Sequence, residues 1–377
     1  MKKLIFFLAS LFVLEPAVAQ STSDEIVKAL DQKLEEIYKA SKLPGISFTL
    51  VMQSDAPITL VKGMADIERN IAMTPDTKMP GGSTGKVFYS VVAMQLMQEG
   101  RLELDLPISN YLKGPWLKRI PNGEALTVRH LMRHQSGLPR YIFNPAFPEE
   151  VRRDADRVWK PEELLAFVFD ADPLFESGTS FAYSDTNYIL LAMVIEAVTG
   201  NDLYDEVERR VLQRAGLKNV VPQTGRQYEN LAQGYSGEND PFFPGKALDE
   251  NGVGRYNWQF EWAGGGLVIT TRDLAVLNKK IFEGNMFEML MLPTYLDGVE
   301  AGELGGEWGL GVHIQDTPHG KTFGHSGYMP GYITNVLHYK DYGFSICYQV
   351  NTSDRSRLQG YGALAQLADI IVEGLKK

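Results

Sequence analysis

Cysteine is almost absent from this sequence, because Cys347 is the only one in 377 residues. No disulfide can form within the chain, and the thiol is expected to be an inert core residue. Basic residues are in deficit, with 37 Lys and Arg against 47 Asp and Glu. This balance disfavours nucleic acid or an anionic membrane surface as a partner. After the N-terminus no apolar run is long enough to cross a bilayer, so no membrane span is expected in the mature chain.

The N-terminus has the features of a secretory signal peptide. Lys2 and Lys3 precede an apolar run over residues 4–14, which is shorter than a membrane-spanning helix. Ala17-Val18-Ala19 then forms a small-x-small cleavage site. We therefore expect residues 1–19 to be removed, the mature domain to cover residues 20–377, and the protein to be periplasmic or secreted.

Hydrophobic periodicity predicts strands at both ends of the chain and helices in between. The expected strands cover residues 46–52, 58–62, 308–315, 321–324, 332–339 and 343–350. The expected helices cover residues 26–37, 83–99, 126–134, 161–169, 188–198, 203–215 and 358–375. This order predicts an α+β fold, in which a sheet region (20–75 plus 256–377) is assembled from both chain ends and a mostly helical region (76–255) is inserted.

Ser83 is the only serine followed by a lysine three residues later, Lys86. If Ser83 opens a helix, positions i and i+3 share a face, so the amine projects beside the hydroxyl. A desolvated lysine can act as the base that activates a serine, and the helix N-terminus favours a developing oxyanion. On its own the pair also fits a helix-capping serine with a solvated lysine.

The same residues form a G-x-S-x-G pattern, Gly81 to Gly85, which is typical of a nucleophile elbow. That interpretation requires an α/β-hydrolase, with a buried strand directly before the serine. Pro75 and Pro80 lie where the strand should run, and only two strand candidates precede the pattern. The elbow is therefore kept as an alternative.

Four further segments occur in a characteristic order. They are residues 126–139 (LTVRHLMRHQSGLP), 177–188 (SGTSFAYSDTNY), 263–275 (AGGGLVITTRDLA) and 324–331 (GHSGYMPG). Together with Ser83 and Lys86 they resemble the serine β-lactamase-like family. This family includes class C β-lactamases, D-Ala-D-Ala carboxypeptidases, D-aminopeptidases and related esterases. The resemblance covers nearly all of the mature chain and implies a β-lactamase/transpeptidase-like fold, with an antiparallel sheet flanked by N- and C-terminal helices.

The resemblance also implies the catalytic roles. Ser83 matches the nucleophile, Lys86 the lysine that shares its proton, and Tyr183 the tyrosine that acts as base and then protonates the leaving group. The backbone N–H groups of Ser83 and Tyr328 match the oxyanion hole. Residues 228–230 also spell Tyr-x-Asn, but they lack the surrounding context of Tyr183.

Two positions depart from the family pattern. Asp185 stands where the family usually has Asn, and a carboxylate there should keep Lys86 charged and shift the role of base toward the tyrosine. It also lacks the amide's N–H donor for a substrate carbonyl. His325 stands where many members have lysine, which lowers the expectation of an efficient β-lactamase. Asp185, His325, Ser326 and Gly327 are the expected substrate-binding residues.

The sequence thus predicts an exported serine hydrolase that acts on small amides, D-amino-acid peptides or esters through an acyl-enzyme. A penicillin-binding or sensor protein that acylates once without turnover is a second hypothesis, and the α/β-hydrolase esterase is a third. We expect a small-molecule or peptide substrate, no cofactor and no metal site. His130 and His134 share a helix face, but no acidic or cysteine partner accompanies them.

Overall fold

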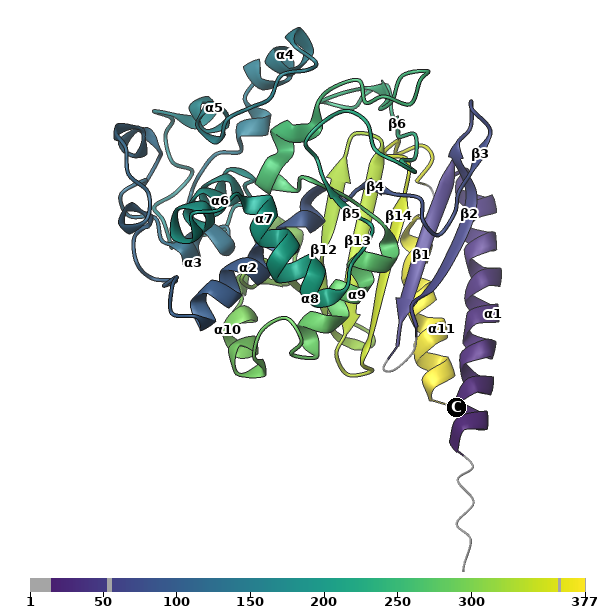
Figure 1. Cartoon of the computed structure of the whole chain (residues 1–377). Coiled ribbons are helices and arrows are strands. Elements are labelled where there is room, and N and C mark those ends of the chain that lie inside the picture. The colour runs from purple at the N-terminus through teal and green to yellow at the C-terminus, as the bar shows by residue number, and fades with distance from the viewer. Residues whose placement is uncertain (1–14, 53–55, 359–360, 377) are drawn as a thin grey trace, which may run out of the picture.

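The computed structural model describes residues 15–52, 56–358 and 361–376. A nine-stranded sheet separates a helical lobe from a pair of terminal helices (Figure 1). The strand order is β3-β2-β1-β14-β13-β12-β11-β10-β9, and every pairing in this sheet is antiparallel. The predicted α+β fold, with a sheet built from both chain ends, is therefore confirmed.

The strands of the main sheet come from two distant parts of the chain. They are β1 (Gly45–Val51), β2 (Ile58–Asp66), β3 (Ile71–Ala72), β9 (Val299–Glu300), β10 (Glu307–Trp308), β11 (His313–Thr317), β12 (Gly320–Met329), β13 (Tyr332–Tyr339) and β14 (Phe344–Val350). A small sheet joins β4 (Met79–Pro80), β8 (Leu267–Ile269) and β5 (Val220–Pro222), and β6 (Tyr235–Ser236) pairs with β7 (Gly245–Lys246).

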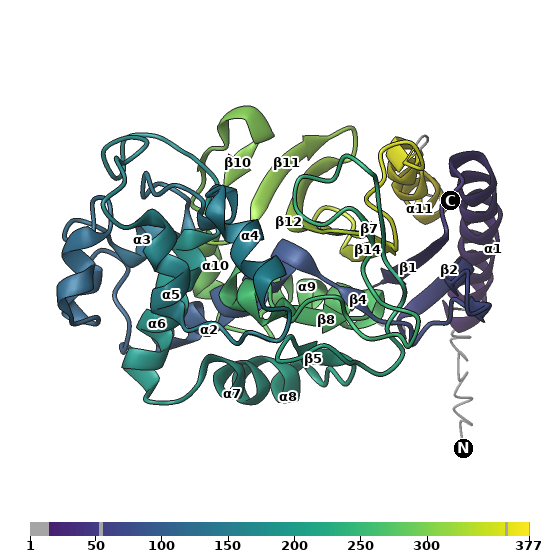
Figure 2. The ribbon, with the colours of Figure 1, turned by 90° about the horizontal axis from the view of Figure 1, so that it is seen from above.

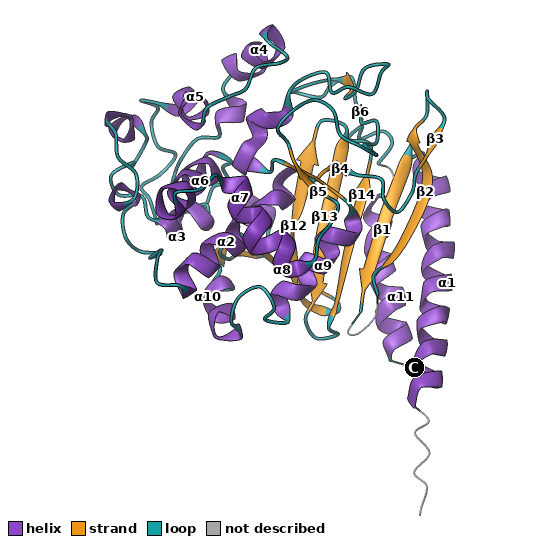
Figure 3. Ribbon diagram, in the orientation of Figure 1, coloured by secondary structure: helices purple, strands orange, loops and turns teal. Residues whose placement is uncertain are grey.

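Most helices lie in the lobe on one side of the sheet (Figure 3). The helices are α1 (Glu15–Ser41), α2 (Lys86–Gln98), α3 (Val128–Met132), α4 (Ala146–Arg153), α5 (Pro161–Leu165), α6 (Thr186–Thr199), α7 (Leu203–Val207), α8 (Gln213–Ala215), α9 (Thr271–Phe282), α10 (Leu292–Tyr295) and α11 (Gln366–Leu375). None of the helices in the described ranges is both long and apolar enough to cross a bilayer.

The terminal helices α1 and α11 lie side by side on the outer face of the sheet (Figures 1 and 2). Leu34 of α1 and Ile371 of α11 join Phe48 and Phe344 of the central strands in one buried cluster. The other face of β1 carries short polar side chains that bond to α9, where Ser47 and Thr49 each lie 2.8 Å from the Thr271 hydroxyl. Because both faces of β1 are covered, the whole strand is buried.

Several other elements lie where the sequence predicts them, but their ends differ from the predicted ends. Helix α1 runs from residue 15 across the predicted cleavage point between Ala19 and Gln20, while residues 1–14 of the predicted signal lie outside the described residues. Strand β12 continues to Met329, beyond the predicted end at Gly324. Helix α9, which the sequence reading did not assign, packs on β1, β13 and β14.

Glycines allow β12 to lie against the turn that opens α2, a 3₁₀ turn over Gly82–Gly85. A Cβ atom on Gly327 would lie 1.9 Å from the carbonyl oxygen of Gly81, and one on Gly85 would lie 1.7 Å from that of Gly265. No side chain can occupy either space. The backbones of β12, the turn and the segment before β8 therefore meet at one point.

Gly327→Ala should force β12 away from the 3₁₀ turn and lower the free energy of unfolding by roughly 1–3 kcal/mol, the usual cost of overpacking. Urea denaturation measures this change. Gly225→Ala is the matched control, because its Cβ would meet no atom within 4 Å. Equal midpoints for the two variants would show that the close approach has no energetic weight.

Candidate active site

Ser83 lies in the 3₁₀ turn that joins β4 to α2, and Lys86 is the first residue of α2. In a 3₁₀ turn, residues three apart are eclipsed, so both side chains point to the same side. Lys86 Nζ donates a hydrogen bond to Ser83 Oγ at 3.0 Å. The lysine side chain is 0% exposed. The predicted juxtaposition of hydroxyl and amine is therefore present, and Lys86 is a buried charge and not a solvated one.

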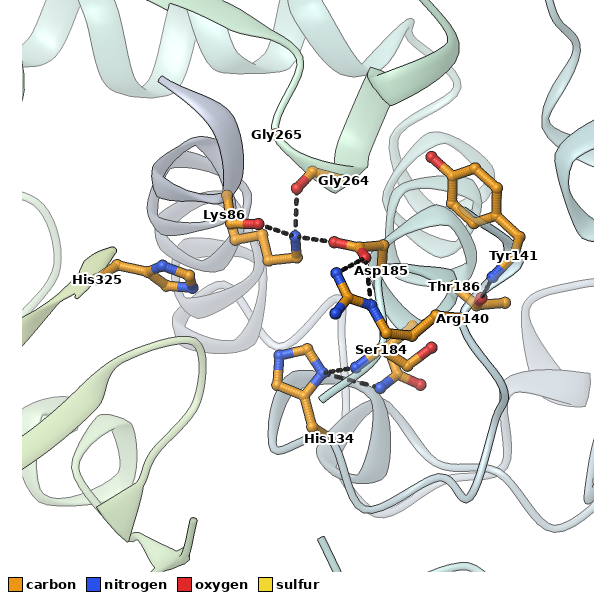
Figure 4. Close-up of polar contacts among 12 residues, drawn as sticks. Lys86, His134, Arg140, Tyr141, Ser184, Asp185, Thr186, Gly264, Gly265 and His325 are labelled. Atoms are coloured by element: carbon orange, nitrogen blue, oxygen red, sulfur yellow. Dashed lines mark hydrogen bonds and ion pairs between the residues drawn. The ribbon is translucent and has the colours of Figure 1, made fainter. Parts of the chain in front are cut away.

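Two further acceptors surround the Lys86 ammonium (Figure 4). Nζ donates to Asp185 Oδ1 at 2.7 Å and to the carbonyl oxygen of Gly264. Burial alone would lower the pKa of Lys86, but attraction to Asp185 and Tyr183 outweighs it and raises that pKa above its ordinary value. The expectation that Asp185 keeps the lysine charged agrees with this geometry.

Tyr183 lies in the loop before α6, with its ring beside the ammonium. The distance from Lys86 Nζ to the ring centroid is 5.2 Å. Burial raises the pKa of Tyr183, while the Lys86 charge and a contact with Ser83 oppose that rise. The net direction is upward, so the resting side chain is a neutral phenol. The three predicted catalytic side chains therefore lie together.

His134 packs against the tyrosine. Its ring lies 4.1 Å from the Tyr183 ring, centroid to centroid. Nδ1 accepts a hydrogen bond from the backbone N–H of Ser184 at 3.2 Å and lies 3.0 Å from the Asn187 amide nitrogen. His130 instead accepts from the backbone N–H of Thr127. Within the described ranges, no three His, Cys, Asp or Glu residues are placed to hold a metal ion.

Arg140 is a site residue that sequence reasoning missed. Its Nε and Nη2 donate to Asp185 Oδ2 at 2.9 and 2.7 Å, opposite the oxygen that binds Lys86. Burial would raise the pKa of Asp185, but Arg140 and Lys86 together hold it far below its ordinary value. No spacing rule connects positions 140 and 185, so only the proximity of Arg140 to the 126–139 segment could have suggested it.

The Tyr328 backbone, a predicted oxyanion-hole component, lies against the serine turn. Pairing between β11 and β12 ends at His313 and Gly324, so β12 has no β11 neighbour at Tyr328. A Cβ on Gly82 would lie 2.7 Å from the Tyr328 backbone nitrogen. The Tyr328 backbone nitrogen thus lies next to the turn that carries Ser83, as two oxyanion donors need to be.

His325 is a neutral acceptor in the cleft. Its Nδ1 lies 2.6 Å from the Ser326 carbonyl oxygen and must donate to it, because a carbonyl can only accept. Burial is the main reason that the pKa of His325 falls to about 3. Nε2 therefore carries a lone pair, and it is buried without a hydrogen-bond partner among the described residues. No fixed positive charge stands at this position.

Two cavities open on either side of Ser83. The first, which we name the aromatic cavity, has a volume of about 250 Å³ and is lined by Tyr141, Phe143, Phe147, Phe242, Phe243 and Phe260. The second, the strand cavity, has a volume of about 550 Å³ and is lined by Trp308, His313, His325, Ser326, Gly327 and Asn335. Ser83, Arg140 and Tyr328 line both. The predicted substrate-binding residues His325, Ser326 and Gly327 thus share the strand cavity, while Asp185 lines the aromatic one.

Glu261 is a second residue that the sequence did not reveal. It lines the aromatic cavity and accepts a hydrogen bond from the Gly266 N–H, and the Gln223 amide lies 2.8 Å from its Oε2. Burial is the main cause that raises the pKa of Glu261 to about 7. Through its hydrogen bond with the Gly266 N–H, the carboxyl group holds the glycine segment in place. The Gly264 carbonyl of this segment accepts a hydrogen bond from Lys86.

The nucleophile-elbow interpretation is wrong. The strand before Ser83 is the two-residue β4, which pairs antiparallel with β8 in the small sheet. An α/β-hydrolase elbow requires a central parallel strand at that place. The alternative Tyr228 is also remote, since its ring stacks on Trp258 and its hydroxyl donates to the Gly225 carbonyl.

Comparison with known proteins places this geometry in context. A family model described as Beta-lactamase matches residues 30–369. A D-aminopeptidase from Brucella anthropi is 27% identical over 325 residues, covering 84% of this chain and 57% of the relative. One from Brucella ovis is 26% identical over 340 residues, covering 86% and 58%. The chain thus spans less than two thirds of the length of these curated relatives.

Two solved structures with the same fold match this chain over nearly the whole of their own length. A D-stereospecific amidohydrolase from Streptomyces sp. has a TM-score of 0.74 at 27% identity and covers 86% of this chain and 94% of that chain. A D-amino acid amidase from Ochrobactrum anthropi SV3 has a TM-score of 0.75 at 23% identity, covering 94% and 99%. At 23% identity the second likeness supports the fold alone.

Glu261→Gln should change how stability depends on pH. The raised pKa means that the folded protein keeps a proton that the unfolded chain loses, so stability falls as the pH rises from 4.5 to about 7. The effect of this carboxyl is roughly 3 kcal/mol, at ~1.4 kcal/mol for each pKa unit. Urea denaturation at pH 5 and pH 8 should show a smaller loss in the variant than in wild type. The exposed Glu303→Gln is the control, and the same loss in all three proteins would contradict the assignment.

Proposed function

The chain belongs to the beta-lactamase family, and on this premise we propose that it is a serine hydrolase that forms an acyl-enzyme on Ser83. The proposed substrates are small amides, D-amino-acid peptides or esters. The observation that carries the proposal is the 3.0 Å hydrogen bond between Lys86 Nζ and Ser83 Oγ, with Tyr183 buried beside the same ammonium.

Acylation needs one proton acceptor near Ser83. Both Lys86 and Tyr183 have raised pKa values, so the resting pair holds two protons and must first lose one. Once that proton is gone, the Lys86 charge stabilises a phenolate, and Tyr183 Oη can take the proton of Ser83. Ser83 Oγ then bonds to the substrate carbonyl carbon. The resulting oxyanion accepts hydrogen bonds from the N–H groups of Ser83 and Tyr328.

Collapse of this intermediate completes the acyl transfer. Tyr183 gives the proton to the leaving nitrogen or oxygen atom. The bond between that atom and the carbonyl carbon breaks, and an ester on Ser83 remains. A water molecule then gives a proton to Tyr183 and attacks the ester carbon. The bond to Ser83 Oγ breaks, Oγ recovers the proton, and the carboxylic acid departs.

The aromatic cavity supports an apolar or aromatic group on the acyl side of the substrate. Seven aromatic residues line it beside the nucleophile, and an apolar group gains about 25 cal/mol for each Å² that it buries there. The names of the D-aminopeptidases and of the D-stereospecific amidohydrolase support D-configured amides as substrates.

Mass spectrometry after treatment with a fluorophosphonate tests the nucleophile. Wild type should gain one adduct on Ser83, Ser83→Ala should gain none, and Lys86→Ala should react at least about a hundredfold more slowly, because the charge that stabilises Tyr183 as the general base is lost. Ser90→Ala is the control, since Ser90 bonds to Tyr188 and lies outside the cleft. Normal labelling of Ser83→Ala would refute the proposal. Repeated turnover of a chromogenic ester would distinguish a hydrolase from a protein that is acylated only once.

We further propose that the chain is exported and loses residues 1–19, on the basis of the basic and apolar character of its first residues. Expression in a Gram-negative host should yield a periplasmic protein whose N-terminal residue is Gln20. Edman sequencing of the periplasmic fraction provides the measurement. A cytoplasmic product that keeps Met1 would disprove it.

A further inference from the structure

Arg140 occupies the junction of the two cavities. It lines the aromatic cavity and the strand cavity together with Ser83. Asp185 fixes its guanidinium through two hydrogen bonds. The guanidinium carbon also lies 4.4 Å from the Phe143 ring centroid and 5.3 Å from that of Tyr183. A planar cation held on three sides is pre-organised, so it loses little conformational entropy when it binds a ligand.

One nitrogen of this guanidinium is not used. Nε and Nη2 bond to Asp185, whereas Nη1 has no hydrogen bond to any residue that the structure describes (Figure 4). The side chain remains 28% exposed, although it lies deep enough to border Ser83. A charged donor left open beside a nucleophile can bind an oxygen atom of a bound molecule, at a strength greater than that of neutral hydrogen bonds.

The charges around Arg140 select the kind of group that can bind. Lys86 and Arg140 share the single carboxylate of Asp185, so these three side chains carry a net charge of +1. Both Asp185 oxygens already accept from cations, and the nearby His325 is neutral. Glu261, the other acid of the aromatic cavity, is engaged with Gly266. An ammonium group would be repelled here, whereas a carbonyl or carboxylate oxygen would be attracted.

We propose that Arg140 is a specificity-determining residue that binds an oxygen of the acyl group, carried on the carbon next to the scissile carbonyl. Preferred substrates are then N-acylated or carboxylate-bearing acyl donors, and those with a free ammonium at that carbon are disfavoured. This inference rests on the proposed acyl-enzyme function, and it departs from the name D-aminopeptidase of the curated relatives, which implies a free amine on the acyl group.

Three 4-nitroanilides that share one skeleton test the proposal: those of N-acetyl-D-phenylalanine, D-phenylalanine and 3-phenylpropionic acid. Wild type should have the highest kcat/KM for the N-acetyl compound and the lowest for the free amine at pH 6. Arg140→Met should reduce the ratio of kcat/KM between the N-acetyl and unsubstituted compounds about tenfold, mainly through KM, as expected for a charged hydrogen bond. Arg140→Lys keeps the positive charge but lacks the planar guanidinium with its several donors. Its ratio should lie between those of wild type and Arg140→Met.

The chain offers a matched control at its surface. Arg119 makes the same two-nitrogen contact with Asp170 Oδ2 and lies over the Phe169 ring at 4.7 Å, remote from both cavities. Arg119→Met should leave the substrate ratio unchanged. Thermal denaturation of each variant shows that it is folded before kinetics are compared.

The ratio of kcat/KM between the N-acetyl and unsubstituted compounds distinguishes substrate binding by Arg140 from an indirect effect through Asp185. If Arg140→Met slows all three substrates by one factor, Arg140 only positions Asp185 and the proposal is wrong. An unchanged ratio without any slowing overturns it as well. A competition experiment gives the same comparison: N-acetyl-D-phenylalanine amide should protect Ser83 from the fluorophosphonate better than 3-phenylpropionamide does. Absence of Ser83 labelling in wild type would instead count against the proposed function itself.

Discussion

A buried ammonium group governs the arrangement of the cleft. Lys86 Nζ is removed from solvent, and an unpaired charge in that position would cost several kcal/mol. The fold must therefore bring acceptors to it, and these are Ser83, Asp185 and the Gly264 carbonyl. The last two lie 99 and 178 positions away in the sequence. Three distant segments must meet at one nitrogen atom, and the nucleophile lies where they meet.

The way in which this charge is balanced affects the chemistry. A carboxylate at position 185 holds the proton on Lys86 and leaves Tyr183 as the better acceptor. Arg140 takes the second oxygen of the same carboxylate, so the hold of Asp185 on the lysine is weaker than that of an isolated ion pair. Arg140 also brings N–H donors to a place where the acceptor-only carboxylate has none. One substitution in the family pattern is thus accompanied by a partner that restores both charge balance and hydrogen-bond donors.

Local sequence patterns were sufficient for the long strands β1, β2, β13 and β14, the main helices and the contact between Ser83 and Lys86, because each depends on periodicity within a few residues. The strand predicted over residues 308–315 is instead two short strands, β10 and β11, and strands of two or three residues are too short to show a period. Tyr183 and Asp185 could be identified only by resemblance, since nothing in their spacing relates them to Ser83. Arg140 was missed because its partner is fixed by tertiary packing, and a lone arginine after a proline carries no signal. Helix α9 was missed because several of its polar residues are buried against the sheet, which obscures the amphipathic pattern.

The pairing of β1 with β14 joins opposite ends of the chain, with Ile46 opposite Val350. During synthesis on the ribosome the serine turn emerges early, whereas β12, which borders it, and β14, which pairs with β1, come near the end. Contacts between such distant segments form slowly, and unfinished chains of this kind expose unpaired strand edges. A nascent chain therefore contains Ser83 and Lys86 long before it contains β12, which carries the predicted oxyanion-hole residue Tyr328, so the cleft can be completed only when translation is nearly finished.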